Sequence, residues 1–293
     1  MTSSAADSAP DPPRLAPGLH VAATPIGNLR DASFRLLDAL AAADVVLCED
    51  TRRTGALCAR YGVSAPLRPY HEHNAAAARP KILEALRAGA AYCLVSDAGT
   101  PLISDPGYKL VAEARDAGVP VYAVPGPCAA TAALSVAGLP TDRFFFAGFP
   151  PAKQAARRAF LAAIADVPSA LVFYEAPGRL AESLADMASA YADRDAAIVR
   201  ELTKIHETVR RAPIGELAAV ANEEARGEIV VVVGPPVATA PSAADVDAFL
   251  DEALAGLSVR DAAAVAADAL SISKKAAYAA ALEAKRRRDG GEG

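Results

Sequence analysis

The stretch Ser96–Gly107 combines the carboxylates of Asp97 and Asp105 with two glycines and two prolines. It follows the apolar run Ala91–Val95 and precedes a helical pattern that begins at Tyr108. Open α/β sheets bind their ligands at the carboxyl ends of strands, where a loop of this kind would lie. We therefore expect the loop to form part of a ligand site, with Asp97 facing the ligand and Asp105 holding the loop. An ordinary well-capped connection is the plain alternative.

Two other loops share this composition and constrain the chemistry of the ligand. Pro25–Asn28 and Pro125–Ala129 each follow an apolar run, and their backbone groups can face a ligand with little reorganisation. None of the three loops contains a lysine. The chain also lacks a G-x-x-x-x-G-K-S/T sequence and a G-x-G-x-x-G sequence after a predicted strand. A phosphate-rich ligand is therefore a poor fit, and a zwitterionic or adenosyl ligand fits better.

The elements that must position these loops alternate between strand and helix patterns. Strands are expected at Leu19–Ala23, Val45–Cys48, Leu67–Tyr70, Ala91–Val95, Val119–Val124, Phe144–Ala147, Ala170–Tyr174, Ala196–Arg200 and Ile229–Val233. Helices are expected around Phe34–Ala41, around Ile82, Leu83 and Leu86, and over Tyr108–Ala117, Ala155–Ala165, Leu180–Tyr191 and Ile214–Asn222. In the first helix we expect Phe34, Leu37 and Leu40–Ala41 to share one face. The alternation predicts βα units, a mostly parallel sheet and hence an α/β fold.

Composition divides the chain into four parts. Residues 1–17 are rich in Ala, Ser, Pro and Asp without periodicity, and we expect a disordered tail. The change at Gly138-Leu139-Pro140 separates two expected α/β domains, 18–138 and 139–236. A Pro/Ala/Ser linker ends at Ser242 and leads into a helical domain, 242–288. Its expected helices are Ser242–Leu254, Ser258–Ala269 and Ser273–Arg288, and the break Leu270-Ser271-Ile272 suits a helix-turn-helix.

The overall composition excludes several classes of protein. The chain has 293 residues, of which 53% are hydrophobic and 22% charged, as in a globular protein with room for two cores. No run is long enough to span a membrane, and the start does not resemble a signal peptide. The four cysteines show no metal-ligand spacing, so we expect reduced thiols in a cytosolic protein. The net charge of −5 means that any nucleic-acid contact must come from local basic clusters.

Eight short motifs occur in order along the chain: Thr24–Leu29, Glu49–Arg52, His71–Asn74, Ser96–Gly107, Val124–Pro127, Gly148–Pro150, Phe173–Pro177 and Arg200–Lys204. Their order and spacing resemble those of the ribosomal RNA small subunit methyltransferase I family, within the tetrapyrrole methylase superfamily. The resemblance runs from about Leu19 to Gly234. The C-terminal helices resemble the small helix-turn-helix that the family carries.

The resemblance implies two α/β domains with parallel or mixed sheets that bind S-adenosylmethionine in the cleft between them, in a homodimer. It further implies methyl transfer to the ribose 2′-oxygen of a cytidine in the decoding region of 16S ribosomal RNA. By motif position it places the cofactor on Ile26, Asp97, Gly99, Thr100, Ile103, Cys128, Ala129, Tyr174, Arg200, Glu201 and Glu228. Gly178 stands where the family usually has His, so a contact from that side chain would be lost. Cys128 stands where Ser is also common.

Transfer of a methyl group to a ribose hydroxyl needs a base, because the hydroxyl is a poor nucleophile until its proton is being removed. The candidates in the motifs are His71, His73, Glu49, Asp50, Glu175 and Lys204, and Asn74 could orient the ribose. A structural role or a phosphate contact is an open alternative for each histidine. His71 and His73 could also form a metal pair, but no third ligand is evident and no metal is expected. Glu49 and Asp50 could instead pair locally with Arg52 and Arg53.

Ribosomal RNA requires basic surface, and the chain offers it only in short clusters. The predicted RNA-binding residues are Arg52, Arg53, Lys153, Arg157, Arg158, Lys274 and Lys275, with Arg210-Arg211 and Lys285–Arg288 as further clusters. For each cluster the alternative is a solvated helix face. We expect Lys285–Arg288 to be a disordered basic tail.

Two other functions stay open at this point. One is a small-molecule methyltransferase of the same superfamily that acts on a tetrapyrrole; the Glu49–Arg52 and His71–Asn74 motifs and the C-terminal helices speak against it. The other is a nucleic-acid-binding regulator that senses the adenosyl ligand without chemistry.

Overall fold

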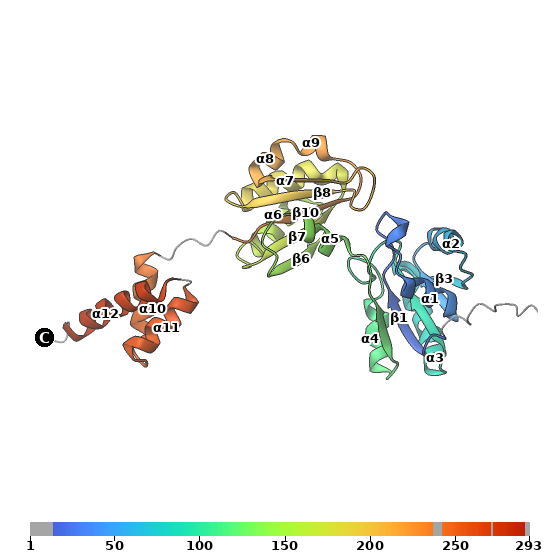
Figure 1. Ribbon diagram of the computed structural model, residues 1–293, viewed down its shortest axis with the longest axis horizontal. Coiled ribbons are helices and arrows are strands. Elements are labelled where there is room, and N and C mark those ends of the chain that lie inside the picture. Colours follow the sequence, from blue (N-terminus) through green and yellow to red (C-terminus); the bar gives the residue numbers. More distant parts are fainter. Residues whose placement is uncertain (1–13, 237–241, 271, 291–293) are drawn as a thin grey trace, which may run out of the picture. The chain divides into compact units, whose positions relative to one another are not determined.

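The computed structural model describes residues 14–236, 242–270 and 272–290 (Figure 1). The chain divides after Pro236 into two compact units. The first holds two five-stranded sheets and the second holds three helices. Three of the expected features lie outside the described residues: most of the tail, the linker before Ser242, and Ser271 in the break between the last two helices. Within the tail, residues 14–17 have no helix or strand, and Leu15 packs against the core of the first sheet.

The first sheet is parallel throughout, in the order β3-β2-β4-β1-β5. Its strands are β1 (Gly18–Ala22), β2 (Val45–Cys48), β3 (Leu67–Pro69), β4 (Ala91–Leu94) and β5 (Val121–Val124). The crossovers contain the short 3₁₀ turn η1 (Leu29–Asp31), α1 (Phe34–Ala42), α2 (Thr51–Arg60), α3 (Glu72–Arg87) and α4 (Tyr108–Asp116). Helices α1 and α2 cover one face and α3 and α4 the other, as a parallel sheet requires. Because β4, β1 and β5 are neighbours, the loops that follow them lie side by side at one edge.

The second sheet is mixed, in the order β6-β7-β10-β8-β9, with β6 and β7 parallel and the other pairs antiparallel. Its strands are β6 (Phe144–Gly148), β7 (Ala170–Glu175), β8 (Asp195–Arg200), β9 (Thr208–Pro213) and β10 (Ile229–Val233). Its helices are α5 (Ala129–Val136), α6 (Gln154–Ala163), the 3₁₀ turn η2 (Pro177–Arg179), α7 (Leu180–Ala190), α8 (Ile214–Ala219) and α9 (Ala221–Glu224).

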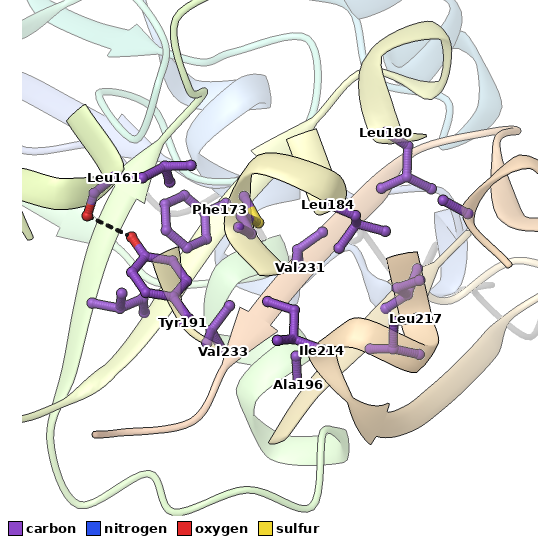
Figure 2. Packing of buried hydrophobic residues seen from close by; sticks show 14 of the residues in the cluster. Leu161, Phe173, Leu180, Leu184, Tyr191, Ala196, Ile214, Leu217, Val231 and Val233 are labelled. Atoms are coloured by element: carbon purple, nitrogen blue, oxygen red, sulfur yellow. Dashed lines mark hydrogen bonds between the residues drawn. The ribbon is translucent and has the colours of Figure 1, made fainter. Parts of the chain in front are cut away.

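Alternate residues of the second sheet form two cores. On one face Phe173 and Val231 pack against leucines of α6, α7 and α8, and the Tyr191 hydroxyl donates to the carbonyl oxygen of Leu161 at 2.9 Å (Figure 2). On the other face Val172, Val199 and Val232 pack against α5, which precedes the expected boundary at Gly138 in the chain. The packing of α5 joins the two halves of the first unit, and a boundary near Gly138 stays a prediction.

The second unit consists of α10 (Ala243–Ala253), α11 (Val259–Ala269) and α12 (Lys274–Gly290). Its core is Leu250 with alanines from α11 and α12, so the helices pack through small side chains. The Ser242 hydroxyl accepts the N–H of Asp245 and the Ser258 hydroxyl accepts the N–H of Asp261, which begin α10 and α11 as their sequences predict. The expectation of a disordered tail at Lys285–Arg288 is wrong, because α12 continues through it. Arg287 pairs with Asp247 and holds this end of α12 against α10.

Several other expectations need correction. Phe34 is 88% exposed and Ala41 is also exposed. The buried face of α1, which is capped by Ser33, is formed by Leu36, Ala39 and Leu40, at positions i, i+3 and i+4. The run Ile214–Asn222 is two helices, with a break at Val220. Strand β9 and helices α2 and α5 were not expected. No helix among the described residues is long and apolar enough to cross a membrane.

Candidate active site

A cavity of about 390 Å³ lies between the loops of the first sheet and the ends of β7 and β10 in the second. We call its two sides the first wall and the second wall. The first wall consists of Ile26, residues 97–100 and 103–105, and Cys128–Ala129, from the loops after β1, β4 and β5. The second wall consists of Phe149, residues 174–177, Leu202 and residues 227–230. Nine of the predicted cofactor residues therefore meet in one cavity: Ile26, Asp97, Gly99, Thr100, Ile103, Cys128, Ala129, Tyr174 and Glu228.

The three loops of the first wall are bonded to one another. The N–H of Thr24 donates to the carbonyl oxygen of Gly99 at 2.9 Å, and the N–H of Gly99 donates back at 3.1 Å. The Thr100 hydroxyl donates to the carbonyl oxygen of Pro127 at 2.9 Å, which ties the β4 loop to the β5 loop. Gly99 has a φ of 81°, and a Cβ there would lie 3.2 Å from Cγ2 of Ile26. Both constraints favour glycine at this position, and the hydrogen bonds between the three loops hold the first wall together.

Aromatic side chains line part of the second wall. The Tyr174 ring lies edge-on to Phe146 at 5.0 Å and to Phe149 at 5.5 Å between centroids. Its hydroxyl accepts the N–H of Ala130, at the start of α5. Burial raises the pKa of Tyr174, so its phenol stays protonated. With Leu202, Ile229 and Val230, these rings offer an apolar surface with a fixed polar atom, which suits a flat heterocycle.

The cavity also contains four carboxylates, three of which have basic partners. Asp97 accepts the N–H of Asp50 at 3.0 Å and lies 3.5 Å from Arg53. Glu175 is buried and pairs with Arg179 at 2.6 Å, with the Ser183 hydroxyl also donating to it. Glu228 is exposed and lies 3.3 Å from Lys204.

Asp105 is the fourth carboxylate, and it was expected only to hold the loop. Burial and then the negative charge of Glu49 raise the pKa of Asp105 to about 6, against a hydrogen bond with Ser96 that lowers it. Asp105 faces the same cavity as Asp97. Both aspartates line the cavity, so lining does not distinguish a ligand-facing Asp97 from an Asp105 that holds the loop, and this assignment stays a prediction.

Two predicted cofactor residues, Arg200 and Glu201, do not line the cavity. The Glu201 carboxylate accepts the N–H of Glu228 and the ammonium of Lys204, both at 2.8 Å, and these bonds lower its pKa. Arg200 lies 3.4 Å from Glu224. Through its bond to the N–H of Glu228, Glu201 links the loop after β8 to the segment that precedes β10.

Of the six candidate bases, Glu175 lines the cavity, whereas His71, His73, Glu49, Asp50 and Lys204 do not. Asn74, which could orient the ribose, does not line it either. His71 caps α3, where its N–H donates to the Asn74 side chain at 2.9 Å, and Asn74 donates in turn to the carbonyl oxygen of Pro69 at 2.8 Å. The Asn74 amide is therefore engaged in the cap. Glu49 and His73 are exposed, and Lys204 pairs with Glu201 and Glu228.

The predicted RNA-binding residues divide into exposed and buried. Arg52, Arg53, Lys153, Arg158, Lys274 and Lys275 are exposed. Arg52 pairs with Asp50 at 2.7 Å, as the local salt-bridge alternative predicted, whereas Arg53 faces Asp97. The prediction that Arg157 is a surface residue that binds RNA is wrong, because its side chain is 1% exposed and pairs at 2.7 Å with the equally buried Asp186. Arg210 and Arg211 are paired with Glu223, Glu224 and Asp195.

Several lining residues were not predicted as cofactor contacts: Ala98, Ser104, Asp105, Phe149, Glu175, Ala176, Pro177, Leu202, Gly227, Ile229 and Val230. Many of them are adjacent in the sequence to a predicted residue at the end of a strand. This adjacency is the feature of the sequence that could have identified them. Gly178 lies one residue beyond this wall, and a Cβ there would meet no heavy atom within 4 Å. No steric constraint therefore requires glycine at the position where the family usually has His.

The thiols and possible metal ligands add no further site. All four cysteines are free, as expected. The rings of His71 and His73 lie 6.0 Å apart between centroids. Within the described residues, no group of three His, Cys, Asp or Glu side chains is placed to hold a metal ion.

Comparison with known proteins places the chain in a family. The family of tetrapyrrole (corrin/porphyrin) methylases matches residues 18–218, and the RsmI C-terminal HTH domain matches residues 240–285. Ribosomal RNA small subunit methyltransferase I of Mesorhizobium japonicum is 48% identical over 95% of this chain and 96% of its own length. The protein of the same name from Pseudomonas aeruginosa is 46% identical over 90% of this chain and 96% of its own length.

Among solved structures, uroporphyrin-III C-methyltransferase of Thermus thermophilus, complexed with S-adenosylhomocysteine, has the same fold. It is 21% identical and matches 75% of this chain and 97% of its own with a TM-score of 0.51. The identity and coverage of the sequence relatives are much higher, and they extend through the C-terminal helices. The chain belongs to the ribosomal RNA small subunit methyltransferase I family of the tetrapyrrole methylases.

Proposed function

We propose that this chain is an S-adenosylmethionine-dependent methyltransferase that methylates the ribose 2′-oxygen of a cytidine in the decoding region of 16S ribosomal RNA. The observation that supports it most is the cavity between the two walls, in a chain that matches a relative of that name over 95% of its length. We further propose that it acts as a homodimer in the cytoplasm and that its partner is the small ribosomal subunit.

The residues of the cavity fit the cofactor in chemistry. An adenosyl sulfonium has a flat base, ribose hydroxyls, an amino acid end and a positive sulfur. Tyr174, Leu202 and Ile229 would hold the base, and the backbone of Gly99 and Ala129 offers polar groups close to the ligand. The carboxylate of Asp97 gives the first wall the negative charge that a cation requires. The chain lacks a G-x-x-x-x-G-K-S/T sequence, and no G-x-G-x-x-G sequence follows a predicted strand, so its motifs do not favour a nucleotide phosphate.

The bound cofactor would supply an electrophilic methyl group on a leaving group that departs neutral. The chain's own task is then to align a ribose hydroxyl with that methyl group, exclude water and accept the hydroxyl proton. Exposed Arg52 and Arg53 follow Asp50 at the start of α2, and Arg53 borders a second cavity of about 280 Å³ that shares Asp97 with the first. We propose that these arginines bind RNA phosphates beside the site and that Lys153, Arg158, Lys274 and Lys275 make further contacts with the RNA.

The direct test is incubation of the purified protein with methyl-labelled S-adenosylmethionine and small ribosomal subunits that lack the modification. We expect label in 2′-O-methylcytidine after digestion to nucleosides. The linkage that follows the modified ribose should also resist alkali, because alkaline cleavage needs a free 2′-hydroxyl. A tetrapyrrole precursor serves as the competing substrate. Label in the tetrapyrrole and none in RNA would contradict the proposal, and stoichiometric binding without label in either would favour a non-catalytic sensor.

Replacement of Asp97 tests whether the cavity serves this activity. Asp97→Ala should raise the Kd for S-adenosylmethionine by ~10–100-fold, because it removes a charged group with hydrogen-bonding capacity from the first wall. Binding of the small subunit should be retained. Asp38→Ala, on the exposed face of α1, is the matched control and should leave both properties at the wild-type level. Normal cofactor affinity in Asp97→Ala would remove Asp97 from the site.

A further inference from the structure

Asp105 differs from every other carboxylate that lines the cavity. Asp97, Glu175 and Glu228 each face an arginine or a lysine within 4 Å. In the part of the chain that the structure describes, no basic side chain pairs with Asp105. A carboxylate that is engaged by a guanidinium or an ammonium must give up that ion pair when it accepts a proton. Among the four, only Asp105 can accept a proton without breaking an ion pair of the described residues.

The backbone around Asp105 is held in an unusual conformation. Leu102 has a φ of 73° and Ser104 a φ of 64°, both in the left-handed region that side chains disfavour. Gly107 has a φ of 134°, and a Cβ there would lie 2.9 Å from Cδ2 of Leu94. Left-handed conformations of non-glycine residues persist where the surroundings impose them, and they cluster at functional sites. The loop is therefore built to hold Asp105 in one place at the wall.

The groups around Asp105 adjust its proton affinity. Burial and the negative charges of Glu49 and Asp97 raise the pKa of Asp105 to about 6, against a hydrogen bond with Ser96 that lowers it. The protonated Tyr174 lines the same cavity. At neutral pH the carboxylate is ionised, and it binds a proton more strongly than an ordinary aspartate. A general base works best when its pKa is close to the working pH.

We propose that Asp105 is the base that takes the proton from the acceptor ribose hydroxyl, an inference that rests on the methyl-transfer function proposed above. The hydroxyl oxygen bonds to the methyl carbon as that carbon leaves sulfur, and the electron pair of the broken bond stays on sulfur. The hydroxyl proton passes to a carboxylate oxygen of Asp105. A sulfonium and a carboxylate thus become a neutral thioether and a carboxylic acid, and Asp105 later returns the proton to water.

The first experiment compares Asp105→Asn with the wild type on small subunits at saturating S-adenosylmethionine. We expect kcat to fall by ~10²–10⁴-fold while the calorimetric Kd for S-adenosylmethionine stays at the wild-type value. A kcat within a few-fold of the wild type would overturn the proposal. So would a loss that comes entirely from weaker cofactor binding. The wild-type reaction in the same assay tests the methyltransferase function by itself, so failure of that function is seen separately.

The second experiment uses Glu49→Gln, which removes the largest neighbouring charge that acts on Asp105. We expect the acidic limb of kcat/KM to move to lower pH, because the ionised form of Asp105 is then less disfavoured. The carboxyl ¹³C signal of Asp105 in the cofactor-free protein should titrate near pH 6 in the wild type and lower in the variant. An unmoved limb, or loss of activity in Glu49→Gln at every pH, would assign the base to another group.

Discussion

The two walls of the cavity differ in how their carboxylates are paired with basic side chains. On the second wall Glu175 pairs with Arg179, and Glu228 faces Lys204. The nearby Glu201 is likewise bound by Lys204 and by a backbone N–H. On the first wall Asp97 faces only the exposed Arg53, and Asp105 has no basic partner among the described residues.

This difference distinguishes carboxylates that support the structure from a carboxylate that is available for chemistry. Paired carboxylates hold loops in place through their ion pairs, whereas a partly buried, unpaired carboxylate destabilises the fold and remains free to act on a ligand. Both walls contain left-handed non-glycine residues, at Leu102 and Ser104 on the first and at Glu201 and Thr203 beside the second. Strain alone therefore does not distinguish them, and charge pairing does.

The largest expected difference in stability between variants of the two walls involves Arg179. Arg179→Ala leaves the fully buried carboxylate of Glu175 with only neutral donors, so we expect the free energy of unfolding to fall by about 3 kcal/mol in denaturant titration. Arg53→Ala is the matched change on the first wall. Since Arg53 is 69% exposed and 3.5 Å from Asp97, its loss should cost less than about 1 kcal/mol. Equal losses in the two variants would show that the walls do not differ in this respect.

A second pair of variants should move stability in opposite directions. Glu201→Gln weakens two charge-assisted hydrogen bonds and should lower the free energy of unfolding by about 1–2 kcal/mol. Asp105→Asn, the same chemical change on the first wall, should raise it at pH 7, because the ionised carboxylate is disfavoured in the folded protein. Denaturant titration of both variants at pH 7 measures the two signs. A loss of stability in Asp105→Asn would mean that its carboxylate supports the loop, as the sequence suggested.

The sequence predicted the first wall better than the second. Val45–Cys48 and Ile229–Val233 were predicted with their exact bounds because fully buried strands are continuous apolar runs. The Gly/Pro loops after β1, β4 and β5 were visible for a similar reason, since their composition has few uses other than tight turns. Leu202 and Gly227 carry no such signal. They lie on two segments that are distant in the sequence and are joined by the hydrogen bond from the N–H of Glu228 to Glu201.

The features that the sequence did not predict depend on contacts between residues that are distant in the sequence. Thr208–Pro213 is an exposed edge strand with two arginines, so it lacks the alternating pattern that would reveal a strand. Arg157 and Arg158 are adjacent in a basic cluster, but the helix directs Arg157 to the buried Asp186 and leaves Arg158 60% exposed. The raised pKa of Asp105 depends on Glu49 and on burial, neither of which local sequence discloses. The paired and the unpaired carboxylate look the same in a sequence.

The smallest effect, and the most specific, is the pH dependence of the Asp105→Asn difference in the cofactor-free protein. The pKa of Asp105 is about 6 in the folded protein and near 3.8 for an ordinary aspartate, so between these values the folded state binds more protons than the unfolded state. The contribution of Asp105 to stability therefore falls as the pH rises through this window and is constant above it. The stabilisation by Asp105→Asn should be smallest near pH 4, grow towards pH 6 and then level off, as measured by denaturant titration at each pH. A difference that stays flat across the window would mean that Asp105 is neutralised by a partner, and the two walls would then treat their carboxylates alike.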